Sequence, residues 1–293
     1  MRESKLGLFV GLITIDFIYL AKSVPRNNQK IVATNYTVTA GGPATNAAIA
    51  FSYWNRAKLL GVVGSHPIRN LIVADLDTYH VTLQDLNPTQ VDPPPVSSII
   101  VTEATGERAV VSINAVNTQV KGDRLPEDIL QEVDIVLIDG HQMTVGSAIA
   151  RQAKENNIPV VIDGGSWKPG FEEVLPFVDY AVCSANFHPP GCNTTTEVLA
   201  YLTSVGIPYI AITQGENPIQ YQANGKYNTV AVPQVEAVDT LGAGDIFHGA
   251  FCNYILQTSF PDALAAAAGV AAASCQFFGT RRWMDATIKI IFD

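Results

Sequence analysis

Short apolar runs recur along the chain and alternate with stretches in which apolar residues return every three or four positions. The short runs predict buried strands at residues 8–15, 59–63, 135–138, 160–162, 180–183 and 209–213. The longer stretches predict helices at residues 43–54, 144–156 and 195–205, and another that begins near residue 242. Strands and helices that alternate in this way predict an α/β fold, with a mainly parallel sheet covered by helices on both faces. In such a sheet the ligand site lies beyond the carboxyl ends of the strands.

Two β-rich segments interrupt this alternation, because neither is followed by a crossover helix of its own. Residues 30–39 are followed closely by Gly41 and Gly42, and residues 97–113 have the pattern of a hairpin. Together they predict a small sheet that projects from the main sheet as a lid over the site. We therefore expect a single domain over residues 1–293, with lid strands at about 30–39 and 97–113.

Composition argues against several classes of protein. The chain has 293 residues, 47% hydrophobic and 15% charged, which predicts a globular protein with a large core. A net charge of −9 without a basic stripe argues against a nucleic-acid partner. The four cysteines have neither metal-site nor disulfide spacing, so we expect reduced thiols and a cytoplasmic location. Asp16 and Gln276 interrupt two long apolar stretches, which favours buried elements over a signal peptide or a membrane span.

Residues 239–251, DTLGAGDIFHGAF, place two glycines between two aspartates at the predicted start of a helix. Gly242, Ala243 and Gly244 let the backbone turn tightly and approach a ligand closely. The first amides of a helix lack partners within it, and the helix dipole adds positive potential, so the segment predicts an anion site. Asp245 would repel a bound phosphate unless it takes a proton from an attacking hydroxyl group. The alternative is that both aspartates only cap and charge the helix N-terminus.

Two further candidates follow predicted strands in the first part of the chain. Asp16 ends an apolar run, where a carboxylate is costly to bury unless it accepts hydrogen bonds, for example from two hydroxyls of a sugar. Gly41, Gly42 and Asn46 lie in a turn that opens a helix, where glycine backbone and one amide side chain suit a polyol. The plainer alternatives are a partly exposed aspartate and an ordinary helix start with Pro43 in its first turn. The residues alone leave both choices open.

A third candidate is the strand end at Thr213 and Gly215, which indicates either an approach to a nucleotide or a simple turn. No P-loop of the form GxxxxGKS or GxxxxGKT is present, which argues against a Walker-type ATPase. The first strand–turn–helix unit lacks GxGxxG, which weakens a dinucleotide-binding interpretation.

These motifs together resemble the PfkB carbohydrate-kinase family, also called ribokinase-like. Residues 239–251 fit that family's C-terminal signature along their whole length. Asp16, GGPATNAA at residues 41–48, the lid hairpin and TQG at residues 213–215 precede it in the family's order, so the resemblance covers essentially the full chain. Within the family the chain looks most like the ketohexokinase branch, on the strand ending LITIDFIYL and the lid sequence Gly106-Glu107-Arg108.

The resemblance implies a three-layer α/β/α sandwich with a small β-sheet lid, and an ATP-dependent kinase that uses Mg²⁺. The acceptor would be a hydroxymethyl group of a small sugar, with a ketohexose such as fructose as one example. Asp245 would be the general base, and amides of Gly242, Ala243 and Gly244 would hold the γ-phosphoryl group. The residues that would hold the acceptor are Asp16, Gly41, Gly42, Asn46 and Arg108. Those that would hold the nucleotide are Asn186, Thr213, Gly215 and Cys275.

The chain departs from the family pattern at several positions. Pro189 stands three positions after Asn186, where many members have the glutamate of an Asn-x-x-Glu motif, so the metal ligands stay unknown. Pro43 and Glu107 stand where the ketohexokinase branch has asparagine. These changes keep open a nucleoside kinase of the same fold and a non-catalytic protein that binds a ligand. We also expect no membrane partner, and a homodimer through the lid, because an isolated small sheet leaves unpaired edges.

Overall fold

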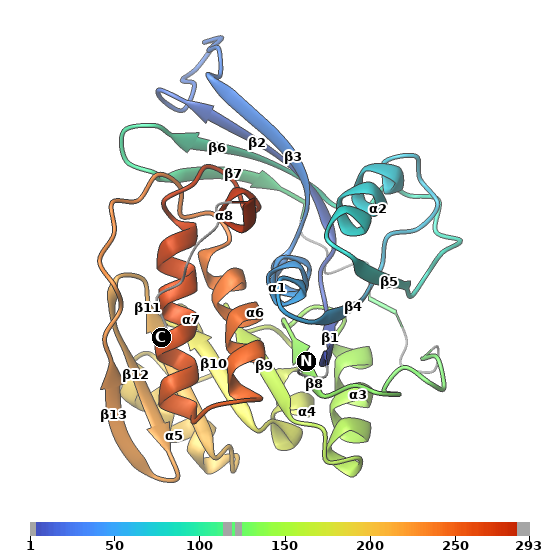
Figure 1. Cartoon of the computed structure of the whole chain (residues 1–293), viewed down its shortest axis with the longest axis vertical. Helices are drawn as coiled ribbons and strands as arrows, with labels where there is room; N and C mark the ends of the chain where they lie inside the picture. Colours follow the sequence, from blue (N-terminus) through green and yellow to red (C-terminus); the bar gives the residue numbers. More distant parts are fainter. Residues whose placement is uncertain (1–3, 114–118, 121–124, 286–293) are drawn as a thin grey trace.

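The computed structural model describes residues 4–113, 119–120 and 125–285, and these residues form a large and a small β-sheet (Figure 1). The large sheet has nine strands in the order β13-β12-β11-β10-β9-β8-β1-β4-β5. Their bounds are β1 Leu6–Val10, β4 Arg56–Gly61, β5 Val81–Asp85, β8 Ile135–Ile138, β9 Val160–Gly164, β10 Tyr180–Ser184, β11 Tyr209–Gln214, β12 Asn217–Ala223 and β13 Lys226–Val230. Neighbouring strands are parallel from β5 to β11, and β12 and β13 continue the sheet antiparallel. The parallel strands therefore end at one edge of the sheet, where a ligand site is expected.

The small sheet covers that edge, as predicted for a lid (Figure 1). Its strands lie in the order β3-β2-β6-β7, with bounds β2 Thr14–Ala21, β3 Asn35–Gly41, β6 Val96–Thr102 and β7 Arg108–Ser112. β6 and β7 are the antiparallel hairpin expected from the sequence. The other lid segment begins as a strand only at Asn35, not at residue 30.

The prediction of one strand at residues 8–15 was wrong. This apolar run is divided between β1 and β2, which belong to different sheets. The chain leaves the large sheet at Gly11, where a side-chain carbon would lie 2.0 Å from the Asp139 carboxylate. Asp16 consequently belongs to a lid strand and not to the end of a strand in the large sheet.

Helices cover both faces of the large sheet, so the predicted three-layer sandwich is confirmed (Figure 1). One face carries α1 Pro43–Ser52, α2 Arg69–Thr78, α6 Ala243–Ile255, α7 Phe260–Ser274 and α8 Arg282–Asp285. The other carries α3 Met143–Glu155, α4 Phe171–Val174, a 3₁₀ turn at Leu175–Phe177 and α5 Thr195–Ser204. α2 was not predicted, because it buries little more than Ile72 and Leu76 and its apolar pattern is weak. None of the helices in the described residues has both the length and the apolar character needed to span a membrane.

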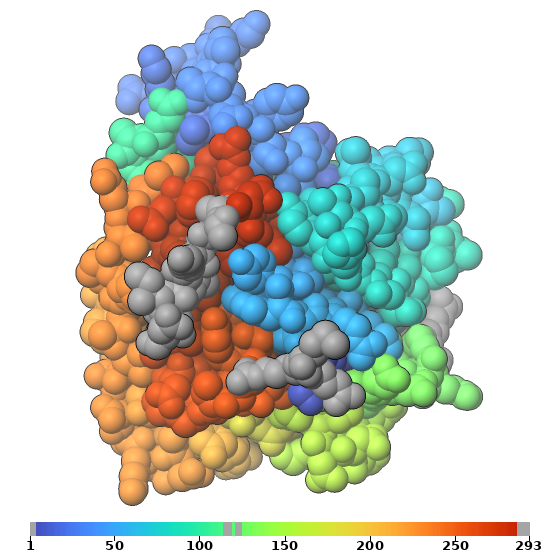
Figure 2. Space-filling model, viewed as in Figure 1, coloured from blue at the N-terminus to red at the C-terminus, as the bar shows by residue number. Residues whose placement is uncertain are grey.

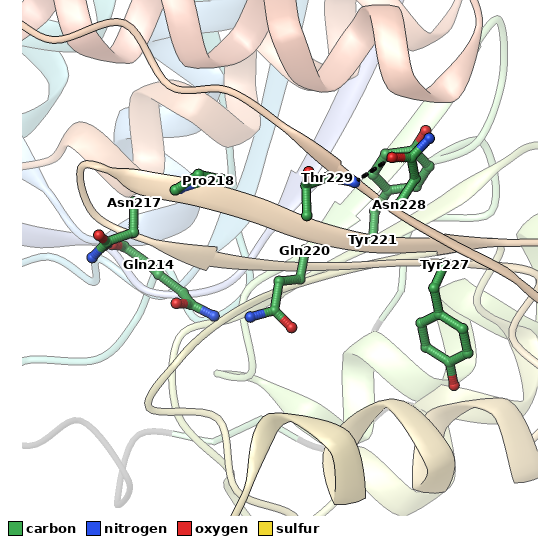
Figure 3. Close-up of a pocket in the computed structure, with 8 residues that line it drawn as sticks. All are labelled: Gln214, Asn217, Pro218, Gln220, Tyr221, Tyr227, Asn228 and Thr229. Carbon is green, nitrogen blue, oxygen red and sulfur yellow. Dashed lines mark hydrogen bonds between the residues drawn. The ribbon is translucent and has the colours of Figure 1, made fainter.

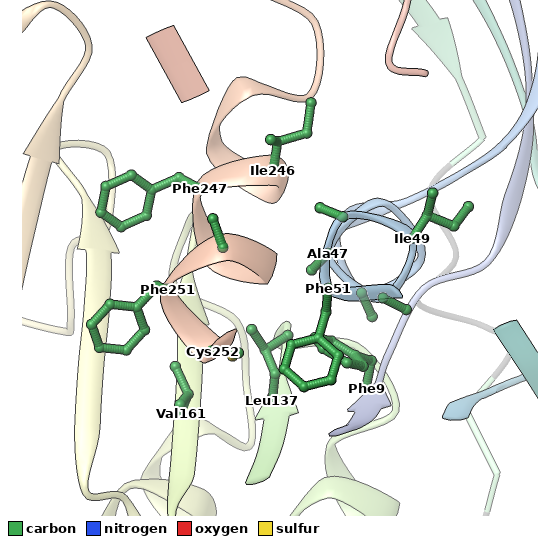
Figure 4. Packing of buried hydrophobic residues seen from close by; sticks show 14 of the residues in the cluster. Phe9, Ala47, Ile49, Phe51, Leu137, Val161, Ile246, Phe247, Phe251 and Cys252 are labelled. Atoms are coloured by element: carbon green, nitrogen blue, oxygen red, sulfur yellow. The ribbon is translucent and has the colours of Figure 1, made fainter. Parts of the chain in front are cut away.

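The side chains of β1 alternate between two cores, one on each face of the sheet. Leu8 lies in the core beneath α3 and α5, whereas Phe9 lies in the core beneath α1 and α6. Phe9 packs against Phe51 with ring centroids 5.4 Å apart, and Phe251 of α6 belongs to the same cluster (Figure 4).

α1 and α6 pack directly against each other on this core (Figure 4). The contact depends on Gly249, where a side-chain carbon would lie 2.3 Å from the carbonyl oxygen of Ala47. This close packing holds the N-terminal ends of α1 and α6 side by side at the carboxyl edge of the sheet. Asn46 in α1 and Asp245 in α6 therefore meet, although 199 positions separate them in the chain.

Candidate active site

α6 begins directly after Gly242, whose φ of 70° lies in the left-handed region that glycine adopts at little cost. A side-chain carbon at Gly242 would also lie 2.7 Å from a neighbouring methyl group, so space requires glycine too. Gly244 is exposed with open space around it, which leaves its backbone accessible to a ligand. The amide of Ala243 is already occupied in part, because it donates to the carbonyl oxygen of Thr240 at 3.4 Å.

Asp245 lies in the first turn of α6 and accepts a hydrogen bond from the side-chain amide of Asn46 at 2.8 Å. Burial raises the pKa of Asp245 to about 7, and the nearby carboxylate of Asp163 acts in the same direction. The hydrogen bond from Asn46 and the charge of His248 oppose this rise. Asp245 keeps partial access to solvent, so a ligand hydroxyl can reach it. A carboxyl group with this pKa can accept a proton near neutral pH.

Two residues outside the predicted set hold the first turn of α6 in place. Asp163 of β9 is buried, and burial raises its pKa although the charge of His248 opposes the rise. Nδ1 of His248 lies 3.6 Å from Oδ2 of Asp163 and 2.7 Å from the carbonyl oxygen of Gly244. Nε2 of His248 lies 3.1 Å from the carbonyl oxygen of Val182 in β10. These contacts fix the helix that carries Asp245 against β9 and β10.

Asp16 forms part of the site wall contributed by the lid. The residue is 8% exposed, and the hydroxyl of Thr14 donates to its Oδ1 at 2.7 Å. Burial raises the pKa of Asp16, while hydrogen bonds from Thr14 and Ser97 and the charge of Arg281 oppose the rise. The structure thus brings the carboxylate expected to bind hydroxyls into the same polar cluster as Asn46 and Asp245, with Arg281 as the link.

Gly41 and Gly42 are both required by the space around them. A side-chain carbon at Gly41 would lie 2.0 Å from Oδ2 of Asp16. Gly42 has a φ of 98°, and a side-chain carbon there would lie 2.3 Å from the carbonyl oxygen of Leu12. Glycine at these two positions therefore lets Asp16 and the backbone of Leu12 pack closely against the start of α1, and Gly42 is partly exposed.

Asp139 follows β8 and was not among the predicted site residues. Its carboxylate accepts hydrogen bonds from the backbone amides of Leu12 at 2.9 Å, Ala44 at 3.0 Å and His141 at 2.8 Å. Burial disfavours its charge, but the His141 side chain and the backbone donors outweigh burial and lower the pKa of Asp139. This aspartate joins the exit of β1 to the start of α1, and so positions the backbone on either side of Gly42.

The predicted nucleotide residues lie at the ends of neighbouring elements. Thr213 lies near the end of β11, and Asn186 is exposed two residues after the adjacent strand β10. Gly215 has a φ of 61° and no atom within 4 Å of a side-chain carbon position, so its backbone is open to a ligand. Cys275 follows α7, and its carbonyl oxygen accepts a hydrogen bond from the amide of Asp239 at 3.1 Å. The structure therefore groups Thr213, Asn186 and Gly215 at the carboxyl edge of the sheet.

Arg108 begins the lid strand β7 and reaches the segment that precedes α6. Its Nη1 donates to the carbonyl oxygen of Thr240 at 3.1 Å and to the hydroxyl of Thr240 at 3.3 Å. The lid is thus tied to the start of α6, two residues before Gly242.

Neither of two surface hollows in the described residues is centred on Asp245. The larger, of about 550 Å³, lies at the β11–β13 edge and is lined by Gln214, Asn217, Pro218, Gln220, Tyr221, Tyr227, Asn228 and Thr229 (Figure 3). None of the predicted site residues lines it. The smaller, of about 140 Å³, lies between β3 and residues 278–282. Figure 2 shows blue residues of the lid beside red residues of the C-terminal part at this end of the molecule. Within the described residues, no group of three or more His, Cys, Asp and Glu side chains could hold a metal ion.

Arg281 is a further residue of the candidate site that the sequence pattern missed. It is 7% exposed and donates a hydrogen bond to the side chain of Asn46 at 2.9 Å. The available signal was a charged residue just after the apolar stretch of α7, but nothing in the local pattern connects it with α1.

Comparisons with known proteins agree on one family. The family described as pfkB family carbohydrate kinase matches residues 5–286. A ribokinase of Lactococcus lactis subsp. lactis is 23% identical over 286 residues, which are 94% of this chain and 92% of the relative. An adenosine kinase of Schizosaccharomyces pombe is 24% identical over 253 residues, 75% of this chain and 74% of the relative. The structure of Arabidopsis thaliana ribokinase complexed with ribose and ATP has a TM-score of 0.78 at 20% identity, with 100% of both chains covered, and this likeness shows the fold.

Proposed function

The chain belongs to the pfkB family of carbohydrate kinases, and we propose that it transfers the γ-phosphoryl group of ATP to a hydroxymethyl group of a small sugar. The observation that carries this proposal is Asp245, a carboxyl group with a pKa of about 7 in the first turn of α6. Such a group accepts a proton from an alcohol near neutral pH, which an aspartate of ordinary pKa does less well. Its place at a glycine-rich helix start puts it beside an anion site.

The proposed step follows from these positions. Asp245 takes the proton of the acceptor hydroxyl while that oxygen forms a bond to phosphorus, and the bond from phosphorus to the oxygen of the departing ADP breaks. The open backbone at Gly244 and the dipole of α6 favour the negative charge that spreads over the phosphoryl oxygens. The contacts of Asp163 and His248 hold the first turn of α6, and with it Asp245, in place during the step.

The residues at the ends of β10 and β11 fit a nucleotide. Gly215 leaves its backbone open, and Asn186 and Thr213 offer polar side chains on the same edge. ATP bound there would supply the phosphoryl group. Because the described residues contain no cluster of metal-binding side chains, Mg²⁺ would be held mainly through the phosphates, which is its usual preference.

The acceptor would lie between the lid and α1. Asp16 offers carboxylate oxygens to vicinal hydroxyls, and Asn46 offers an amide N–H. A ketohexose remains a prediction from the sequence, and Pro43 offers no polar side chain for it. A nucleoside acceptor is the second candidate, because an adenosine kinase is among the relatives.

We also propose a homodimer, which the lid supports, and a cytoplasmic location, which rests on the cysteine pattern of the sequence. Val110 and Val111 of the edge strand β7 are 48% and 77% exposed, and Tyr36 of the opposite edge strand β3 is 70% exposed. Unpaired strand edges with apolar side chains are favourable surfaces for a second copy. Light scattering at micromolar concentration should give the mass of a dimer, and a monomer alone would remove this idea.

The experiment that tests the function measures ADP release from ATP and Mg²⁺ with single acceptors. The panel holds ribose, deoxyribose, fructose, glucose and adenosine, each with the wild type and with Asp245→Asn. Turnover with one acceptor that the variant loses would support the kinase and name its substrate. No turnover with any acceptor, with ligands that still raise the melting temperature, would favour the non-catalytic binding protein.

A further inference from the structure

Arg281 contacts β3, α1 and α2, which all lie more than 200 positions before it in the chain. Its Nη1 donates to Oδ1 of Asn46 in α1 at 2.9 Å and to the hydroxyl of Thr280 at 2.9 Å. Its Nη2 donates to the carbonyl oxygen of Ala40 in β3 at 2.6 Å and to Oδ2 of Asp75 in α2 at 3.1 Å. The guanidinium group is therefore fixed from the lid, from both helices and from its own segment.

This arrangement is costly as a means of stabilising the fold. Arg281 is 7% exposed, and its Nε, like Oγ1 of nearby Thr39, is buried without a hydrogen-bond partner among the described residues. A buried charge with an unpaired donor costs free energy, and a well-packed apolar side chain at such a position is often equally or more stable. The contacts of Arg281 are thus better explained by what they do to its neighbours.

We propose that Arg281 is a positioning residue that fixes the side-chain amide of Asn46, and through it the orientation of Asp245. Arginine can only donate hydrogen bonds, so the atom of Asn46 that faces it must be the amide oxygen. The NH₂ group of Asn46 then faces Asp245, where it donates to Oδ2 at 2.8 Å. Without Arg281 the amide could rotate by half a turn, and its oxygen would then face the carboxylate.

The same contact restricts what Asn46 offers to the acceptor. Its oxygen is taken by Arg281 and one N–H is taken by Asp245, which leaves one N–H. Asn46 can therefore only donate a hydrogen bond to the sugar, and the sugar atom opposite it must be a hydrogen-bond acceptor. This point rests on the proposed function, whereas the orientation of Asn46 does not.

Several charged groups surround the two ends of this chain of contacts. Those that influence Asp245 are Asp163 of β9, Asp139 after β8 and His248 of α6. Those near Arg281 are Asp16 of β2, Asp75 of α2 and Tyr79 after α2. Only the hydrogen bond from Asn46 depends directly on Arg281, so its loss should act on Asp245 in one direction, toward a higher pKa.

The first test needs no catalytic activity. The carboxyl group of Asp245 is titrated by ¹³C NMR of aspartate-labelled protein, with Asp245→Asn to assign the signal. Arg281→Met should raise the pKa of Asp245 by about one unit, because methionine donates no hydrogen bond to the oxygen of Asn46 and the NH₂ group that favours the charged form of Asp245 is no longer held. Arg282→Gln is the matched control, since Arg282 is exposed and the contacts to Asn46 come from its neighbour. An unchanged titration in Arg281→Met would overturn the proposal.

A second variant covers the case in which Arg281→Met is unstable. Arg281→Met combined with Asp75→Asn removes both charges, so that the carboxylate of Asp75 is not left without its cation. The same upward shift of the Asp245 pKa is expected in this double variant. No shift would contradict the proposal, whatever the stability of Arg281→Met.

The kinetic test uses the acceptor found in the panel. A shift of one unit lowers the ionised fraction of the base at pH 7, so kcat of Arg281→Met should be about fivefold lower there and should approach the wild type near pH 9. In an Asn46→Ala background the Arg281→Met change should alter kcat less than about twofold, because the path through Asn46 is already gone. A loss of kcat that is equal at every pH, or one that persists in the Asn46→Ala background, would overturn the role. If no acceptor is turned over, the proposed function fails, while the NMR titration still tests Arg281.

Discussion

The end of β8 and the beginning of α6 each place a carboxylate at the same edge of the sheet, that of Asp139 buried and that of Asp245 partly exposed. Asp139 accepts hydrogen bonds from three backbone amides and contacts His141, and its pKa is lowered. Asp245 accepts one from the amide of Asn46 and lies near Asp163, and its pKa is about 7. Burial alone therefore does not make a base. The number and charge of the donors around a carboxylate decide whether it holds backbone together or exchanges a proton.

The largest expected effect is on turnover, and it comes from substitution of Asp245. Asp245→Asn should lower kcat by roughly 10²–10⁴-fold, because the alcohol loses its general base. Steady-state ADP release measures this, and calorimetry with ATP should show that the nucleotide still binds. Near-normal turnover would reject Asp245 as the base and leave the two carboxylates without a functional difference.

The same substitution at Asp139 should separate the two aspartates by their effect on stability. In Asp139→Asn an NH₂ group replaces one acceptor oxygen and faces backbone donors, so the free energy of unfolding should fall by about 3 kcal/mol. Urea denaturation of the two variants side by side measures the difference. An Asp139→Asn protein as stable as Asp245→Asn would show that the backbone contacts of Asp139 contribute little.

A pair of glycines tests how rigid the region held by Asp139 is. Gly42 and Gly206 both have a φ of 98°, but a side-chain carbon at Gly42 would lie 2.3 Å from the carbonyl oxygen of Leu12, whereas nothing lies within 4 Å at Gly206. Gly206→Ala should cost about 1 kcal/mol for its conformation alone, and Gly42→Ala about 1–3 kcal/mol more for the clash. Equal costs in urea denaturation would mean that the backbone near Asp139 yields easily.

The pH dependence of stability should differ in sign between the two aspartates. The pKa of Asp245 is raised from 3.8 to about 7, so the folded state binds more protons than the unfolded state between these pH values. The contribution of Asp245 to the free energy of unfolding therefore falls as the pH rises from about 4 to about 7. Asp245→Asn should therefore gain melting temperature relative to the wild type at pH 8 but not at pH 4, by a few degrees at most, since Asp245 keeps partial solvent access. Asp139 has a lowered pKa, so its contribution is complete above 3.8 and is lost only as the pH falls below that value. Melting curves at several pH values that show the same sign for both would contradict this assignment.

The smallest expected effect lies at the larger hollow. Gln220 lines this hollow at the β11–β13 edge and is not among the residues of the candidate site (Figure 3). Gln220→Ala should leave kcat and KM within about twofold and the free energy of unfolding within about 0.5 kcal/mol. A clear loss of activity would move part of the ligand site to this edge of the sheet.

Much of the fold and part of the candidate site could be predicted from the sequence. The layered sheet and the lid hairpin follow from the periods of apolar residues, which report local geometry directly. Asp245 and its glycines could be proposed as site residues because a helix start with bare backbone and a carboxylate has few chemical interpretations. The division of residues 8–15 between two sheets could not be found this way, since both strands read as one continuous apolar run.

The sequence by itself determined most of the elements and the residue types that carry chemistry, because both depend largely on neighbours in the chain. Only the tertiary structure decided which of those residues meet. Asn46 lies 199 positions from Asp245 and 235 from Arg281, and Asp139 joins two segments that precede it by about a hundred residues. These contacts depend on how α1 and α6 pack at Gly249 and on where the lid leaves the sheet. No local pattern records such distances, so the donors that set the pKa of each aspartate become visible only once the layers are packed.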